Sequence, residues 1–110
     1  MKITDLETYL VDTQGLIKWV FVKVTTDEGI VGYGEAGNAF RERAQAAAIQ
    51  ELKPLVLGRD PFESRSFWSH AYKSHLDVRG PSSLHVSAMA AIEFAMWDIV
   101  GKALNTPLYN

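Results

Sequence analysis

Histidine is the side chain best suited to act as a general base or metal ligand near neutral pH, and the sequence has three. His70, His75 and His85 have no carboxylate and no second histidine three or four residues away, the spacing that builds a metal site on a helix. The absence of cysteine removes thiolate ligands, thiol nucleophiles and disulfides. We therefore expect the three histidines to be surface or interface residues.

Charged pairs and glycine motifs also suggest no catalytic site. Asp98 and Lys102 are four residues apart and predict a surface ion pair on a helix, whereas Glu93 has no obvious partner. The Gly-Tyr-Gly run at 32–34 lacks the third glycine of a nucleotide-binding loop, so it predicts close packing against another backbone. The sequence contains no nucleophile elbow, phosphate-binding lysine motif or acid–base carboxylate pair. It therefore assigns no catalytic residue and no metal ligand.

Composition and charge narrow the class of protein. The 110 residues are 47% hydrophobic, which predicts one small domain spanning residues 1–110. A net charge of -2, with scattered lysines and arginines, makes nucleic acid an unexpected partner. No segment approaches the roughly 18 apolar residues of a membrane span, and the start does not resemble a signal peptide. We expect a cytoplasmic protein that binds no membrane.

Side chains that could do chemistry must be positioned by regular elements, and the first 36 residues read as strands. Val20, Val22 and Val24 alternate on one face of a strand over 18–26. Gly29 provides the left-handed turn residue of a hairpin leading into a strand over 30–35. A further strand over 2–11 places Thr4, Leu6, Thr8 and Leu10 on one face. The expected result is a three-stranded antiparallel meander.

Three helices are predicted after the strands, so the fold class is α+β. The first covers about 41–56, where Pro54 either kinks it or ends its regular part. The second covers 61–76, with Asp60 as its cap and Pro61 at its first position; Trp68, Ala71 and Tyr72 belong to its apolar stripe.

The third predicted helix, over 83–104, is apolar nearly all round. Ala88, Ile92, Ala95, Ile99 and Ala103 form one face, and Met89, Met96, Trp97 and Val100 make much of the rest apolar. Two interpretations stay open: the helix is the centre of a small domain, or a further partner packs on its second face.

Four segments, in this order and spacing, resemble the mandelate racemase and muconate lactonizing enzyme branch of the enolase superfamily. They are residues 1–4 (MKIT), 22–36 (VKVTTDEGIVGYGEA), 58–61 (GRDP) and 91–102 (AIEFAMWDIVGK). They are spread from residue 1 to residue 102, so the resemblance covers nearly the whole chain.

The resemblance implies that this chain is an amino-terminal capping domain which ends before a (β/α)8 barrel. In such enzymes the barrel binds Mg²⁺ through three carboxylates and removes the proton beside a substrate carboxylate with a lysine or histidine base. None of those positions exists here, and the six lysines include no Lys-x-Lys pair. The implied partners are the chain's own barrel, a small carboxylate substrate and further copies in a homo-oligomer. The 110 residues alone are expected to be inactive.

The family's lids present two loops to the substrate, which here correspond to residues 12–18 and 36–41. The resemblance makes Asn38, Phe40 and Arg41 candidate substrate-binding residues. An amide and a fixed cation suit the hydroxyls and carboxylate of a sugar acid. Asn38 could instead occupy a turn or cap the next helix, and Arg41 could be a solvated first-turn residue.

Two classes of function stay open. The first is part of an enzyme, with an acid-sugar dehydratase as the expected parent and a racemase, epimerase or cycloisomerase as the alternative. The second is a stand-alone binding or assembly domain that associates through its exposed helix face.

Overall fold

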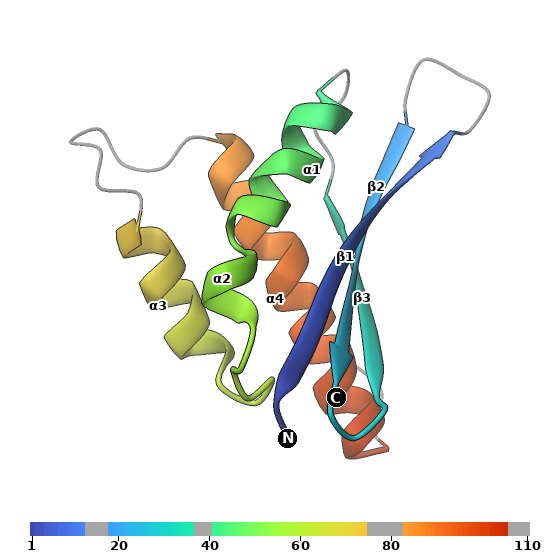
Figure 1. Cartoon of the computed structure of the whole chain (residues 1–110), viewed down its shortest axis with the longest axis vertical. Coiled ribbons are helices and arrows are strands. Elements are labelled where there is room, and N and C mark those ends of the chain that lie inside the picture. The colour runs from blue at the N-terminus through green and yellow to red at the C-terminus, as the bar shows by residue number, and fades with distance from the viewer. Residues whose placement is uncertain (13–17, 37–40, 75–82, 106–110) are drawn as a thin grey trace.

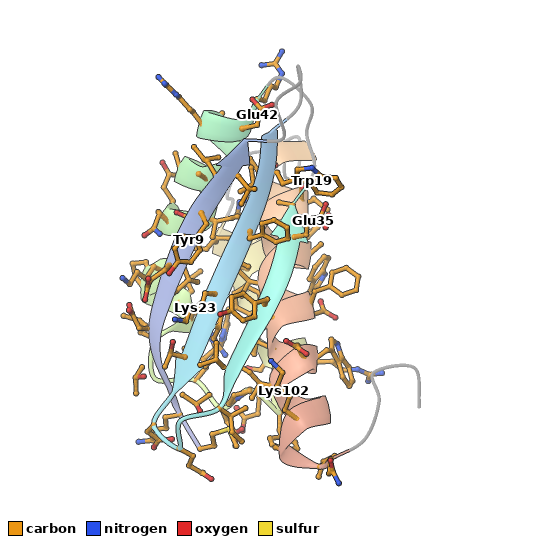
Figure 2. All side chains as sticks on the ribbon, turned by 90° about the vertical axis from the view of Figure 1, so that its right-hand side faces the viewer. Tyr9, Trp19, Lys23, Glu35, Glu42 and Lys102 are labelled. Atoms are coloured by element: carbon orange, nitrogen blue, oxygen red, sulfur yellow. The ribbon has the colours of Figure 1, made fainter. Side chains whose placement is uncertain are left out.

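The computed structural model describes residues 1–12, 18–36, 41–74 and 83–105. Three antiparallel strands, in the order β1-β2-β3, form one layer, and helices cover one face of this sheet (Figure 1). The opposite face carries side chains such as Tyr9 and Lys23 and has no helix over it (Figure 2). The predicted α+β fold with a three-stranded meander is confirmed. The elements are β1 (Ile3–Asp12), β2 (Lys18–Thr26), β3 (Val31–Ala36), α1 (Glu42–Glu51), α2 (Lys53–Val56), α3 (Ser64–Ser74) and α4 (Ser83–Ala103).

Strand β2 has the predicted alternation. Val20, Val22 and Val24 are buried beneath the helices, and the residues between them lie on the other face. Gly29 has a φ of 81°, the left-handed conformation expected for the hairpin that leads into β3.

Strand β1 departs from the predicted alternation at its start. An irregularity in its pairing with β2 lies between Ile3 and Asp5, which leaves Thr4 exposed. Ile3 and Leu6 are both buried, because one extra residue shifts the side-chain alternation. The prediction that Thr4 shares a face with Leu6 is therefore wrong. The N–H of Ile3 donates to the Arg59 carbonyl oxygen at 2.8 Å, which fixes this end of the strand.

The predicted first helix is two helices, α1 and α2, separated at Leu52. Pro54 has no N–H to continue the hydrogen bonding of α1, so it ends the regular part of the predicted helix, which was one of the two interpretations.

The predicted second helix, α3, begins at Ser64, three residues after the predicted start. Asp60 closes a turn instead of capping a helix: its Oδ1 accepts the Phe62 N–H at 2.9 Å, and its carbonyl accepts the Glu63 N–H at 2.9 Å.

The buried face of α3 is also rotated from the predicted stripe. Phe67 and Ala71 are buried, whereas Trp68 is half-buried and Tyr72 is exposed. The predicted stripe is correct at Ala71 and wrong at Tyr72, because it started from Trp68 whereas the buried face includes Phe67. Within the described ranges, no helix is long and apolar enough to cross a membrane.

Helix α4 lies against β3 at unusually short range. A Cβ atom at Gly32 would collide with the Ala95 carbonyl oxygen, and one at Gly34 would collide with the Ala91 carbonyl group. The predicted close approach of another backbone to this glycine pair is confirmed. It places one face of α4 in the core, formed by Ala88, Met89, Ala91, Ile92, Ala95, Met96 and Ile99.

Polar side chains of α4 cover the outer edge of β3. Asp98 and Lys102 form the predicted ion pair, with Nζ and Oδ2 3.1 Å apart. The Tyr33 N–H donates to Asp98 Oδ2 at 2.9 Å, and Lys102 Nζ donates to the Val31 carbonyl oxygen at 2.6 Å. These side chains supply hydrogen bonds where an edge strand has no neighbouring strand.

Replacing Asp98 with alanine is expected to lower the free energy of unfolding by about 1 to 2 kcal/mol, because Tyr33 loses a charged acceptor at a partly exposed site. Urea unfolding measures the loss, and amide exchange should speed up at Tyr33. Lys102→Met is the control, since it leaves the Asp98 acceptor in place. Unchanged Tyr33 exchange in Asp98→Ala would contradict this role.

Candidate functional site

The two segments predicted to face substrate leave the sheet at the same end. Asp12 pairs with Lys18 across the first segment, and Val20 pairs with Ala36, from which the second segment departs. The corresponding strand ends lie together at the top of Figure 1. Residues 13–17 and 37–40, with Asn38 and Phe40 among them, lie outside the described residues.

Arg41 is the described member of the predicted substrate-binding set. It stands immediately before α1, and its carbonyl oxygen accepts the Gln45 N–H at 2.9 Å. Its side chain is exposed and makes no capping hydrogen bond to the helix. A guanidinium at this position adds to the positive end of the α1 dipole, and the acidic Glu42 in the first turn offsets part of this charge.

The two histidines within the described residues, His70 and His85, have different surroundings. His70 lies on the surface, with Nδ1 against Arg59 Nη2, and His75 lies outside the described residues. His85 is half-buried, and its Nε2 lies 2.8 Å from the Ala71 carbonyl oxygen, so it joins α4 to α3. His85 is thus only partly at the surface, because its ring also finds a backbone partner inside the domain.

The donor set of the described residues does not fit a magnesium ion. No three histidine, aspartate or glutamate side chains within these ranges lie close enough together to hold one. Mg²⁺ requires near-octahedral oxygen ligands, commonly carboxylates with waters. We assign no step of chemistry to a metal held by these residues.

Two ionisable groups on the sheet have shifted pKa values for local reasons. The hydrogen bond from Lys53, and then that from the Leu6 N–H, lowers the pKa of Asp5. The stabilisation from ionised Asp5 favours the folded state at pH values above the pKa of aspartate in the unfolded chain. It is lost as the pH falls through the lowered pKa of Asp5 in the folded state. Tyr9 donates to Glu7 Oε2 at 2.5 Å, which raises the tyrosine pKa. Neither group is poised for proton transfer near neutral pH.

The second notable surface is aromatic and lies along the outer side of α4. Phe94 is 56% exposed and Trp97 is 46% exposed. A depression of about 230 Å³ is lined by Trp68, Ala90, Glu93, Phe94 and Trp97. Helix α4 therefore buries one face in the domain and exposes large apolar side chains on another, which favours the interpretation that a further partner packs there.

Glu93 has a partner that sequence spacing could have shown. The Trp97 Nε1–H donates to Glu93 Oε1 at 3.2 Å, a contact between residues four apart on one helix face. The aromatic depression itself was missed, because it needs Trp68 of α3 beside Phe94 and Trp97 of α4. Residues from two helices are brought together by packing, for which no local signal exists.

Comparison with known proteins gives consistent matches. The family model for the mandelate racemase / muconate lactonizing enzyme N-terminal domain matches residues 7–110. The chain is 44% identical over all 110 residues to D-galactonate dehydratase of Xanthomonas campestris pv. campestris (strain B100), of which it spans 27%. It superposes on a protein from Mesorhizobium loti with a TM-score of 0.92 and 37% identity, covering 99% of this chain and 30% of that one.

A third relative has an isomerase name. The 3,6-anhydro-D-galactonate cycloisomerase from Zobellia galactanivorans superposes with a TM-score of 0.84 at 29% identity, covering 94% of this chain and 29% of that chain. The chain thus spans less than a third of each of these three proteins. With the family model matched over residues 7–110, this chain belongs to the mandelate racemase / muconate lactonizing enzyme branch of the enolase superfamily, as its N-terminal domain.

Proposed function

We propose that residues 1–110 form one domain that caps the active site of a Mg²⁺-dependent sugar-acid dehydratase and helps select its substrate. The observation that carries the proposal is the 44% identity to a D-galactonate dehydratase over the whole chain. The capping role is supported by the strand ends at Asp12, Lys18 and Ala36, which lie at one end of the sheet.

The proposed division of labour follows from what the chain contains. The metal, its carboxylate ligands and the base that removes the proton beside the substrate carboxylate belong to a barrel domain outside these residues. The residues of this chain bind and enclose the substrate. Arg41 pairs with the substrate carboxylate, the Asn38 amide hydrogen-bonds a hydroxyl, and Phe40 excludes water.

An isomerase parent is the alternative, favoured by the likeness to a cycloisomerase; a racemase or epimerase belongs to the same class. We further propose a cytoplasmic location and a homo-oligomeric full-length form. The reading frame beyond the Asn110 codon distinguishes both parents from a stand-alone binding or assembly domain. We expect this reading frame to encode a barrel with three metal-binding carboxylates. The protein translated from the whole frame is called the full-length enzyme below. Assays of sugar-acid dehydration and of isomerisation then distinguish the two possible parents. An immediate stop codon would favour the stand-alone domain.

In the full-length enzyme, Asn38→Ala is expected to cost roughly 1 to 3 kcal/mol of transition-state binding, or about 5- to 150-fold in kcat/KM. The reason is that a substrate hydroxyl held in a closed site would lose its hydrogen-bond partner. The measurement is kcat/KM for wild type and variant across a panel of sugar acids, with melting temperature recorded for both.

The control is built into the panel. A sugar acid that lacks the contacted hydroxyl should lose much less activity than one that has it. If Asn38 only forms a turn or a helix cap, all substrates should suffer equally and the melting temperature should fall. That pattern would remove Asn38 from the substrate-binding set.

A further inference from the structure

The depression between α3 and α4 combines aromatic side chains with one carboxylate. Its lining includes Trp68, Phe94 and Trp97, and the carboxylate is that of Glu93. Trp68 is half-buried, whereas the other two aromatic side chains are about half exposed. Two indoles and a phenyl ring in one depression of about 230 Å³ form a ligand-sized surface without a protein occupant among the described residues.

The carboxylate of Glu93 is held in place but not neutralised. The Trp97 Nε1–H donates to Oε1 at 3.2 Å, which ties the carboxylate to the aromatic lining. Glu93 forms no ion pair with any residue in the described ranges. Arg65 shares an adjoining depression with Glu93, Trp68 and Ser69. A negative charge in an aromatic setting therefore remains without a bound cation.

This combination selects for one ligand chemistry. Aromatic faces attract cations through their quadrupole, and tryptophan does so most strongly. A guanidinium is planar, stacks on aromatic rings, is weakly hydrated and can form two hydrogen bonds to one carboxylate. An anion would be repelled by Glu93, and a neutral apolar group would leave its charge desolvated without compensation.

We propose that this depression holds an arginine side chain of the catalytic domain, which makes it a specific docking point between lid and barrel. The inference rests on the proposed function. The chain spans 27% of the dehydratase that it matches, and α4 is the last element that the structure describes. A domain that follows α4 is well placed to pack back onto its exposed side.

The surface beside this depression has the same chemical bias. On the other side of Phe94, a second depression is lined by Phe21, Tyr33, Gly34 and Glu35, and it too places a carboxylate among aromatic rings. Lys102 lies near Tyr33 but is engaged by Asp98 and by the Val31 carbonyl oxygen. Around the exposed aromatic side chains, these depressions place two carboxylates, Glu93 and Glu35, and one cation, Arg65; the excess of carboxylates favours a basic docking surface.

The test uses the 110-residue chain and two matched probes, arginine amide and citrulline amide, which share an α-amino group and differ in carrying a charged guanidinium or a neutral urea at the end of the side chain. The indole N–H resonances of Trp68 and Trp97 are followed by NMR during titration. Arginine amide should shift both resonances and saturate at millimolar concentration. Citrulline amide should bind more weakly by a factor of roughly five or more. Glu93→Gln should abolish this preference, whereas Glu51→Gln, on the exposed side of α1, should preserve it.

The source of the arginine is tested in the full-length enzyme. There the depression is filled, so arginine amide should no longer shift the Trp97 resonance. Equal response to the two probes, or an unchanged preference in Glu93→Gln, would overturn the proposal. Self-association of the isolated chain that protects Trp97 would also overturn it, in favour of a second copy as occupant. These outcomes are independent of Asn38→Ala kinetics, so failure of the substrate-binding role and failure of this contact are distinguishable.

Discussion

Alanine at position 34 is expected to lower the free energy of unfolding by about 3 kcal/mol or more, the largest effect of any single methyl addition we foresee. The added Cβ would collide with the Ala91 carbonyl group and lie only 3.2 Å from the Ala95 nitrogen. These atoms belong to the backbone of α4 and cannot rotate away as a side chain can. The helix must move off the strand, which loosens the core between them.

Urea unfolding of the isolated chain measures this effect, and Gly29→Ala is the matched control. A Cβ at Gly29 meets no atom within 4 Å, so only its φ of 81° opposes alanine there. The Gly29→Ala control should lose roughly 1 to 2 kcal/mol of its free energy of unfolding, which is the cost of holding alanine in a left-handed conformation. A Gly34→Ala variant that loses no more than Gly29→Ala would show that α4 adjusts easily.

Replacing each of two phenylalanines on adjacent helices with alanine is expected to cost very different amounts of stability. Phe67 on α3 is 0% exposed, so Phe67→Ala should cost about 3 to 5 kcal/mol through lost burial and the cavity left behind. Phe94 on α4 is 56% exposed, so Phe94→Ala should lower the free energy of unfolding of the isolated chain much less. Thermal or urea unfolding of both variants gives the comparison.

The same pair reports on the aromatic surface in the full-length enzyme. If a catalytic domain covers Phe94, then Phe94→Ala should lower the stability of the full-length enzyme by more than it lowers that of the isolated chain. The Phe67 variant should show a similar loss in both. Equal losses for Phe94→Ala in the two settings would mean that nothing packs on this side of α4.

The parts of the fold that could be predicted have strong local signals. The valine alternation of β2 reports its own buried face, and the Gly-Tyr-Gly run could be assigned to close packing because glycine inside a strand has few other uses. The ion pair of Asp98 and Lys102 followed from helical spacing alone. What spacing could not show is that both side chains also bind the edge of β3, since that depends on a strand some 65 residues earlier.

The errors arose where neighbouring backbone competed with local preference. Asp60 and Pro61 form a good helix start in sequence, but the Asp60 carboxylate and carbonyl close a turn first. Thr4 left the predicted face because a strand irregularity depends on pairing with β2 and on contacts to residues 58–59. Of the candidate substrate-binding residues, Arg41 lies immediately before α1, and the substrate-binding roles of Asn38, Phe40 and Arg41 all stay predictions that rest on the family resemblance.

The contact between β3 and α4 also constrains when this domain can fold during synthesis. Strands β1 to β3 leave the ribosome first, but the inner side of β3 is completed by Ala91 and Ala95, which are translated about 60 residues later. Helix α1 packs on β1 and β2, but until α4 emerges the apolar side of β3 is uncovered, and a three-stranded sheet needs its apolar face covered for stability. Closing this long loop carries an entropic cost before any packing offsets it. The nascent amino-terminal half is therefore expected to remain a client for chaperones until α4 has emerged.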